Sequence, residues 1–102
     1  MLTIEVRRLS QDEPLRYAVA VREDAGATRH EVTFSAADCA RLSAGRHAPE
    51  QVVEAAFRFL LDREPKEAIL SRFDLTVISR YFPDFERQLP GYLENSDADH
   101  RS

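Results

Sequence analysis

The spacing of apolar residues changes near residue 35, and this change constrains the fold more than any other feature of the chain. Before Ser35, apolar and polar side chains largely alternate, whereas after it apolar positions recur every three or four residues. Alternation is typical of strands with one buried face, and the wider spacing is typical of amphipathic helices. The sequence therefore predicts strands in its first third and helices in the remainder.

Three segments carry the alternation, over residues 2–9, 15–23 and 28–34. The polar links between them are short, so we expect each strand to pair antiparallel with the next. One parity of each segment is apolar, which indicates a sheet covered on one face only. The predicted fold class is α+β: a three-stranded antiparallel sheet (a meander) with one face packed by the C-terminal helices.

Capping and proline signals place the helices. Ser35 and Asp38 have the spacing of a capping box, and Pro49 suits the first position of the strongest amphipathic helix. The sequence predicts three further helical segments, beginning near Pro65, after Asp74, and as a final turn at Asp84.

The chain of 102 residues is long enough for one hydrophobic core. We expect a single domain over residues 1–93 and a disordered tail over residues 94–102, where little can be buried.

No stretch approaches the length of roughly 18 apolar residues that a membrane helix needs, and the N-terminus lacks the order of a signal peptide. Cys39 is the single cysteine, so the chain cannot form an intramolecular disulfide, and we expect a cytoplasmic protein. We expect Cys39 to act as a small buried hydrophobic residue.

A cluster of aromatic residues near the C-terminus is the first candidate binding surface. Four of the nine aromatic residues lie between Phe73 and Phe85. Such a cluster suits either a docking patch or the cover of the core. We expect Phe73 and Phe82 to be buried, and Tyr81 and Phe85 to remain exposed as candidate binding residues.

The outer face of the sheet is the second candidate. Pairing of the second and third strands around Ala25-Gly26 places Arg22 opposite Arg29, and matching the first strand places Arg7 opposite Arg16. Arginines beside the small residues Ala18 and Ala20 suit an anionic partner. The alternative is a solvated face on which Glu5 and Glu31 neutralise their neighbours. The candidate binding residues on this face are Arg7, Arg16, Arg22 and Arg29.

The C-terminal half resembles a group of small bacterial proteins. The resemblance begins with a Val32-Thr33-Phe34-Ser35 segment after a strand hairpin and extends to about Leu89. The residues that carry it in the C-terminal half are Phe59-Leu60-Leu61, Glu64-Pro65, Ile69-Leu70, Phe73-Asp74-Leu75, Ile78 and Tyr81-Phe82-Pro83. It implies a bacterial origin and a shared fold. The group has no assigned activity, so the resemblance transfers no catalytic or binding residue.

Nothing in the sequence indicates a catalytic, metal or cofactor site. The three glycines cannot form a phosphate-binding loop, and no zinc-protease motif or nucleophile elbow is present. His30 lies on the apolar parity of its strand, where it suits either a partly buried general base or a structural residue bonded to a backbone carbonyl.

We therefore expect a small non-catalytic interaction or regulatory module that binds a protein partner or a second copy of itself, with no cofactor and no membrane association. The alternative is a regulatory nucleic-acid-binding protein that uses the arginine-lined face, although the net charge of −4 disfavours it. A small hydrolase or lyase that uses His30 is a third possibility.

Overall fold

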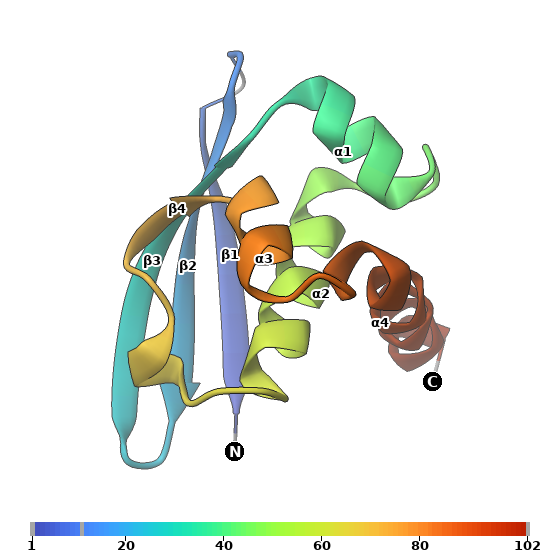
Figure 1. Ribbon diagram of the computed structural model, residues 1–102. Coiled ribbons are helices and arrows are strands. Elements are labelled where there is room, and N and C mark those ends of the chain that lie inside the picture. Colours follow the sequence, from blue (N-terminus) through green and yellow to red (C-terminus); the bar gives the residue numbers. More distant parts are fainter. Residues whose placement is uncertain (1, 11, 102) are drawn as a thin grey trace.

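The computed structural model describes residues 2–10 and 12–101, with side chains described as far as Glu94. It is an α+β fold, as predicted, in which helices cover one face of a sheet (Figure 1). The elements follow the chain in the order β1 (Thr3–Ser10), β2 (Leu15–Glu23), β3 (Gly26–Phe34), α1 (Ala36–Ser43), α2 (Pro49–Leu61), the 3₁₀ helix η1 (Lys66–Ala68), β4 (Arg72–Asp74), α3 (Thr76–Tyr81) and α4 (Phe85–Arg101).

The sheet has four strands and is mixed, which corrects the prediction of a three-stranded antiparallel meander. The strand order is β1-β2-β3-β4, with β1, β2 and β3 antiparallel and β4 parallel to β3. β4 pairs Phe73 with Val32. A strand of three residues shows no alternation, and its partner lies far away along the chain, so periodicity does not reveal it.

The register of the hairpin differs from the predicted register by two residues, although the buried parity is as expected. Glu23 pairs with Gly26, which closes a two-residue turn, and Gly26 has a φ of 144° that favours glycine. Arg22 consequently lies opposite Ala27, and Arg29 lies opposite Ala20. The predicted Arg22–Arg29 pair was wrong.

The same shift applies to the first pair of strands. Arg7 lies opposite Ala18, so the expectation that it faces Arg16 was also wrong.

Helix α2 is the centre of the core because it is buried on two sides. Phe57 packs towards the sheet, with its ring 5.3 Å from His30 and 5.9 Å from Phe73. Phe59 packs towards α4, with its ring 5.1 Å from Phe85. Both α2 residues are fully buried, so this helix joins the sheet layer to the outer helix.

Helix α4 extends well past the predicted turn over residues 84–89, and it includes Pro90. Leu89 and Leu93 are buried, which ties this helix to the core on both sides of the proline. The predicted disordered tail, residues 94–102, lies outside the described side chains except for Glu94. Within the described residues, no helix combines the length and the apolar character needed to cross a membrane.

Candidate functional site

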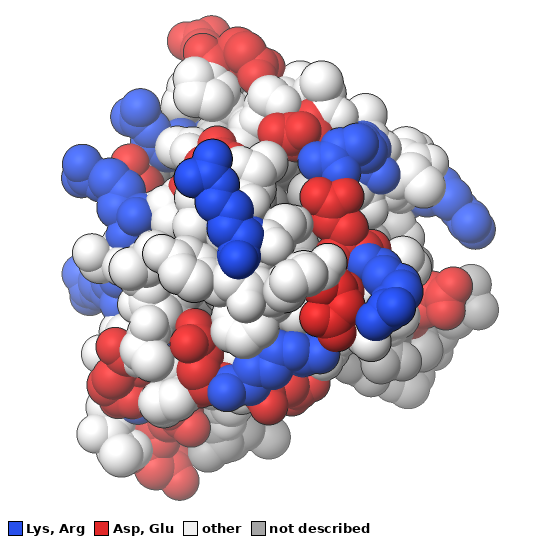
Figure 2. Space-filling view, viewed as in Figure 1, with Lys and Arg blue, Asp and Glu red and all other residues white. Residues whose placement is uncertain are grey.

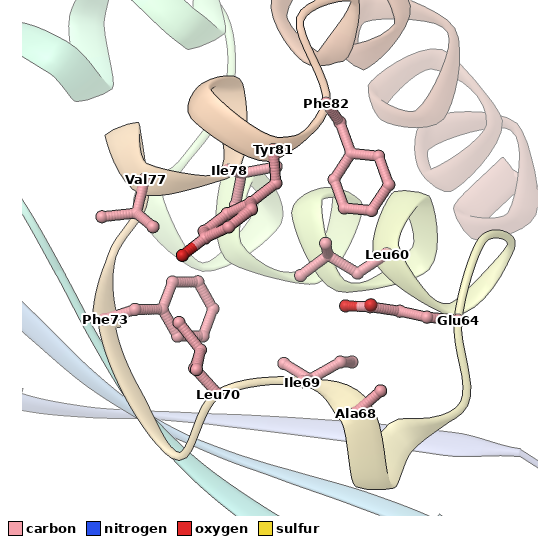
Figure 3. Close-up of a pocket in the computed structure, with 10 residues that line it drawn as sticks. All are labelled: Leu60, Glu64, Ala68, Ile69, Leu70, Phe73, Val77, Ile78, Tyr81 and Phe82. Atoms are coloured by element: carbon pink, nitrogen blue, oxygen red, sulfur yellow. The ribbon is translucent and has the colours of Figure 1, made fainter.

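An apolar pocket opens between the C-terminal end of α2 and the segment that runs from η1 through β4 to α3. Its volume is about 390 Å³, which is within the range of small-molecule and side-chain binding pockets. The lining residues point into it from all four elements and the links between them (Figure 3). They are Leu60, Glu64, Ala68, Ile69, Leu70, Phe73, Val77, Ile78, Tyr81 and Phe82.

Large apolar side chains at the pocket remain in contact with water. Leu70 is 51% exposed and Tyr81 is 69% exposed, while Ile69, Phe73 and Ile78 beneath them are buried. Figure 2 shows an area of uncharged residues in the middle of this face, which one basic side chain crosses and further charged side chains surround. Exposed apolar side chains gathered over a cavity mark a binding surface more often than isolated ones do.

Lys66 fixes the short η1 segment on one side of the pocket. Its side chain is 4% exposed, and its ammonium group lies 2.6 Å from Glu67 Oε2 and 3.0 Å from Glu23 Oε1. Hydrogen bonds to Glu67 and then Glu23 raise the pKa of Lys66 above its ordinary value. The pair with Glu23 links η1 to the end of β2.

His30 fixes the next part of the wall. Its Nδ1 lies 2.7 Å from the carbonyl oxygen of Leu70, and its Nε2 lies 2.9 Å from Oγ1 of Thr28. Because a carbonyl only accepts hydrogen bonds, Nδ1 carries the proton, and in the neutral ring Nε2 accepts from Thr28. The backbone-carbonyl bond expected for a structural His30 is present, and both ring nitrogens are occupied.

Asp74 shapes the opposite wall through hydrogen bonds at the start of α3. Its Oδ1 accepts hydrogen bonds from the backbone N–H of Thr76 at 2.9 Å and from the Thr76 hydroxyl at 2.7 Å. Its Oδ2 accepts from the hydroxyl of Thr33 at 3.2 Å. The carboxylate therefore joins the start of α3 to β3, which holds α3 over the pocket.

Comparisons with family models, curated proteins and solved structures find no match.

The predicted aromatic surface is half correct. Tyr81 is exposed at the pocket rim, and Phe73 is buried, as expected. Phe85 is 1% exposed, so the expectation that it belongs to a surface patch was wrong. Its ring packs edge-on against Phe59, and it belongs to the core.

The outer face of the sheet carries the predicted arginines on either side of Ala18 and Ala20. Three arginines pair with glutamates: Arg22 with Glu5 at 3.4 Å, Arg16 with Glu31 at 3.5 Å and Arg72 with Glu31 at 3.8 Å.

Two further arginines of this face lie beside its small residues. Arg7 lies opposite Ala18, and Arg29 lies opposite Ala20. Neither has an ion pair with another described residue. The face therefore combines the predicted neutralised network with two guanidinium groups that form no ion pair among the described residues.

Glu64, Leu60 and Leu70 are the pocket residues that the sequence did not single out for binding. Apolar residues at helical spacing normally face the core, whereas Leu70 is 51% exposed. An apolar pair, Ile69-Leu70, beyond a three-residue helix was the available signal. The other chemically distinctive residue, Cys39, is free and buried as expected, and burial raises the pKa of its thiol.

Within the described part of the chain, no three His, Cys, Asp or Glu residues converge to hold a metal ion.

Proposed function

We propose that this chain is a small, non-catalytic interaction module that binds a protein partner through the apolar pocket between α2 and α3. The observation that carries the proposal is the exposure of Leu70 and Tyr81 over a cavity of about 390 Å³. A partner that fills the cavity removes these side chains from water, and burial of one large apolar side chain contributes about 1.5–3 kcal/mol.

The chemistry of the pocket supports binding rather than catalysis. Its described lining residues include two with ionisable side chains, Glu64 and Tyr81, and no nucleophile lies beside a base. His30, the candidate base, is 5% exposed and engages Leu70 and Thr28 through its two nitrogens. Neither ring nitrogen of His30 is therefore free to exchange a proton with a substrate.

The test is selection of peptides from a random displayed library on the immobilised protein, followed by affinity measurements on the recovered sequences. Leu70→Ser should weaken binding by about tenfold or more, since one apolar anchor is lost. Leu9→Ser is the matched control because Leu9 is 42% exposed and belongs to β1, and it should change the affinity by less than about twofold. Equal effects of the two substitutions, or failure to select any peptide, would contradict the proposal.

The arginine-lined face supports a second candidate function, binding of nucleic acid. The supporting observation is that Arg7 and Arg29 flank the strip of Ala18 and Ala20 and have no ion pair among the described residues. Affinity for an anionic polymer should then fall steeply with salt.

A paired substitution separates this function from general charge effects. Arg7→Gln/Arg29→Gln should abolish retention on immobilised DNA, while Arg58→Gln/Arg87→Gln, which removes the same charge from α2 and α4, should leave it unchanged. Equal losses in the two variants would show nonspecific attraction and would exclude this face.

A further inference from the structure

Glu64 places a carboxylate among the apolar side chains of the pocket. The residue is partly buried, and its side chain extends into the cavity between Leu60 and Ile69 (Figure 3). No other described residue forms a hydrogen bond or an ion pair with this carboxylate. Other glutamates nearby are paired, as Glu67 is with Lys66 at 2.6 Å.

A carboxylate beside apolar surface is stabilised most by a cation that enters with its own apolar stem. A partner that covered the pocket with apolar groups alone would remove water from Glu64 without replacing its hydrogen bonds, and that is costly. A cation avoids this cost because it forms a charge-assisted hydrogen bond with the carboxylate.

The aromatic rings of the pocket favour the same occupant. Phe73, Tyr81 and Phe82 present three rings to the cavity (Figure 3). The faces of aromatic rings attract ammonium and guanidinium groups. The pocket thus offers one negative charge and several aromatic surfaces within a cavity of about 390 Å³.

We propose that the pocket between α2 and α3 binds a lysine or arginine side chain of the partner, with its aliphatic stem against the apolar walls and its cationic head at Glu64. The inference rests on the proposed function, since it names the chemistry of the residue that the partner inserts. The long stems of lysine and arginine pack on apolar surface while the charged head reaches a polar group.

Two small probes of equal shape test the inference: cyclohexylmethylammonium and its neutral counterpart, cyclohexylmethanol. Each is titrated into the protein while the backbone amide resonances of Leu70, Ile78 and Tyr81 are followed by NMR. The ammonium should bind about tenfold more tightly than the alcohol, the preference expected for one charge-assisted hydrogen bond. Glu64→Gln should reduce this ratio to about one.

Glu54→Gln is the matched control, because Glu54 lies on α2 and pairs with Arg58 instead of lining the pocket. This variant should retain the tenfold preference, and far-UV circular dichroism is used to check that both variants are folded. A Glu54→Gln variant that lost the preference equally would show a general charge effect and would overturn the inference.

The outcomes separate this inference from the proposed function. Equal binding of the ammonium and the alcohol would overturn the inference that the pocket binds a lysine or arginine side chain. It would leave the proposal of an apolar partner-binding pocket intact. Absence of binding by the ammonium would also overturn the inference, while the Leu70→Ser peptide test would still judge the proposed function. If the protein forms a concentration-dependent dimer and Glu64→Gln abolishes it, the occupant of the pocket is a second copy of this chain. That result would overturn the inference that a different protein inserts the basic side chain.

Discussion

Replacement of His30 by alanine tests how the pocket wall is held in place. The imidazole is 5% exposed, donates from Nδ1 to the carbonyl of Leu70 at 2.7 Å and packs against the ring of Phe57. Leu70 follows η1 and precedes β4, so His30 connects the sheet to the segment that forms the pocket. Alanine removes both the hydrogen bond and the ring contact.

The expected loss of unfolding free energy follows from these two contacts. The hydrogen bond to the partly buried carbonyl of Leu70 contributes about 0.5–1.5 kcal/mol. Loss of the buried ring against Phe57 adds about 1–2 kcal/mol. His30→Ala should therefore lower the free energy of unfolding by about 1.5–3.5 kcal/mol, which is a large share of the stability of a small domain.

Urea denaturation followed by far-UV circular dichroism measures this loss. Thr28→Val is the control, since it removes the partner of Nε2 and leaves the bond from Nδ1 to Leu70 in place. Its cost should be about 0.5–1.5 kcal/mol. A loss below about 1 kcal/mol for His30→Ala, or equal losses for the two variants, would refute the assignment of His30 as the residue that secures Leu70.

Three further predictions concern the core and the charged groups around the pocket. Phe59→Ala should cost about 3–5 kcal/mol in urea denaturation, because the ring is fully buried against Phe82 and Phe85; a loss below about 1.5 kcal/mol would contradict the packing of α4. The hydrogen bond from Lys66 lowers the pKa of Glu67 below its ordinary value. The pair therefore stabilises the fold fully at a pH above the ordinary pKa of glutamate, and this stabilisation is lost as the pH falls through the lowered pKa of Glu67. Lys66→Met should remove that part of the acid dependence of the unfolding free energy, and an unchanged pH profile would count against the pair. Burial raises the pKa of Cys39, so its thiol should react with a disulfide reagent slowly in buffer and rapidly in urea; equal rates would mean that it is accessible.

Local patterns identified the parts of the fold that depend on neighbouring residues. Alternation placed Val32 and Phe34 on the buried face of β3, and it placed His30 with them. The cap at Ser35 was also readable, since its side chain accepts from the backbone of Asp38 at 2.9 Å. In each case the signal lies within a few residues of the feature that it predicts.

Features that join distant segments were not readable in this way. β4 pairs with β3 across about forty residues of chain, and its three residues carry no periodic signal. Tyr81 and Phe85 have similar local surroundings, yet Phe85 is buried because Phe59 of α2 packs on it.

The candidate site was predicted only in part for the same reason. Tyr81 was identified by its residue type, whereas the pocket beside it requires α2, η1, β4 and α3 to converge. Glu64 stands out only after the structure places its carboxylate among apolar walls (Figure 3). On the sheet, the predicted arginine face is present, but a shift of two residues in register places alanines, instead of the predicted arginines, opposite Arg7, Arg22 and Arg29.

The most direct test of the central claim is the NMR footprint of a library-selected peptide on the protein. Binding through the pocket predicts that the largest amide shifts fall on Leu70, Ile78 and Tyr81, and that Leu70→Ser removes them. Shifts confined to the outer face of the sheet, around Arg7 and Arg29, would contradict the claim and would assign partner binding to the arginines instead.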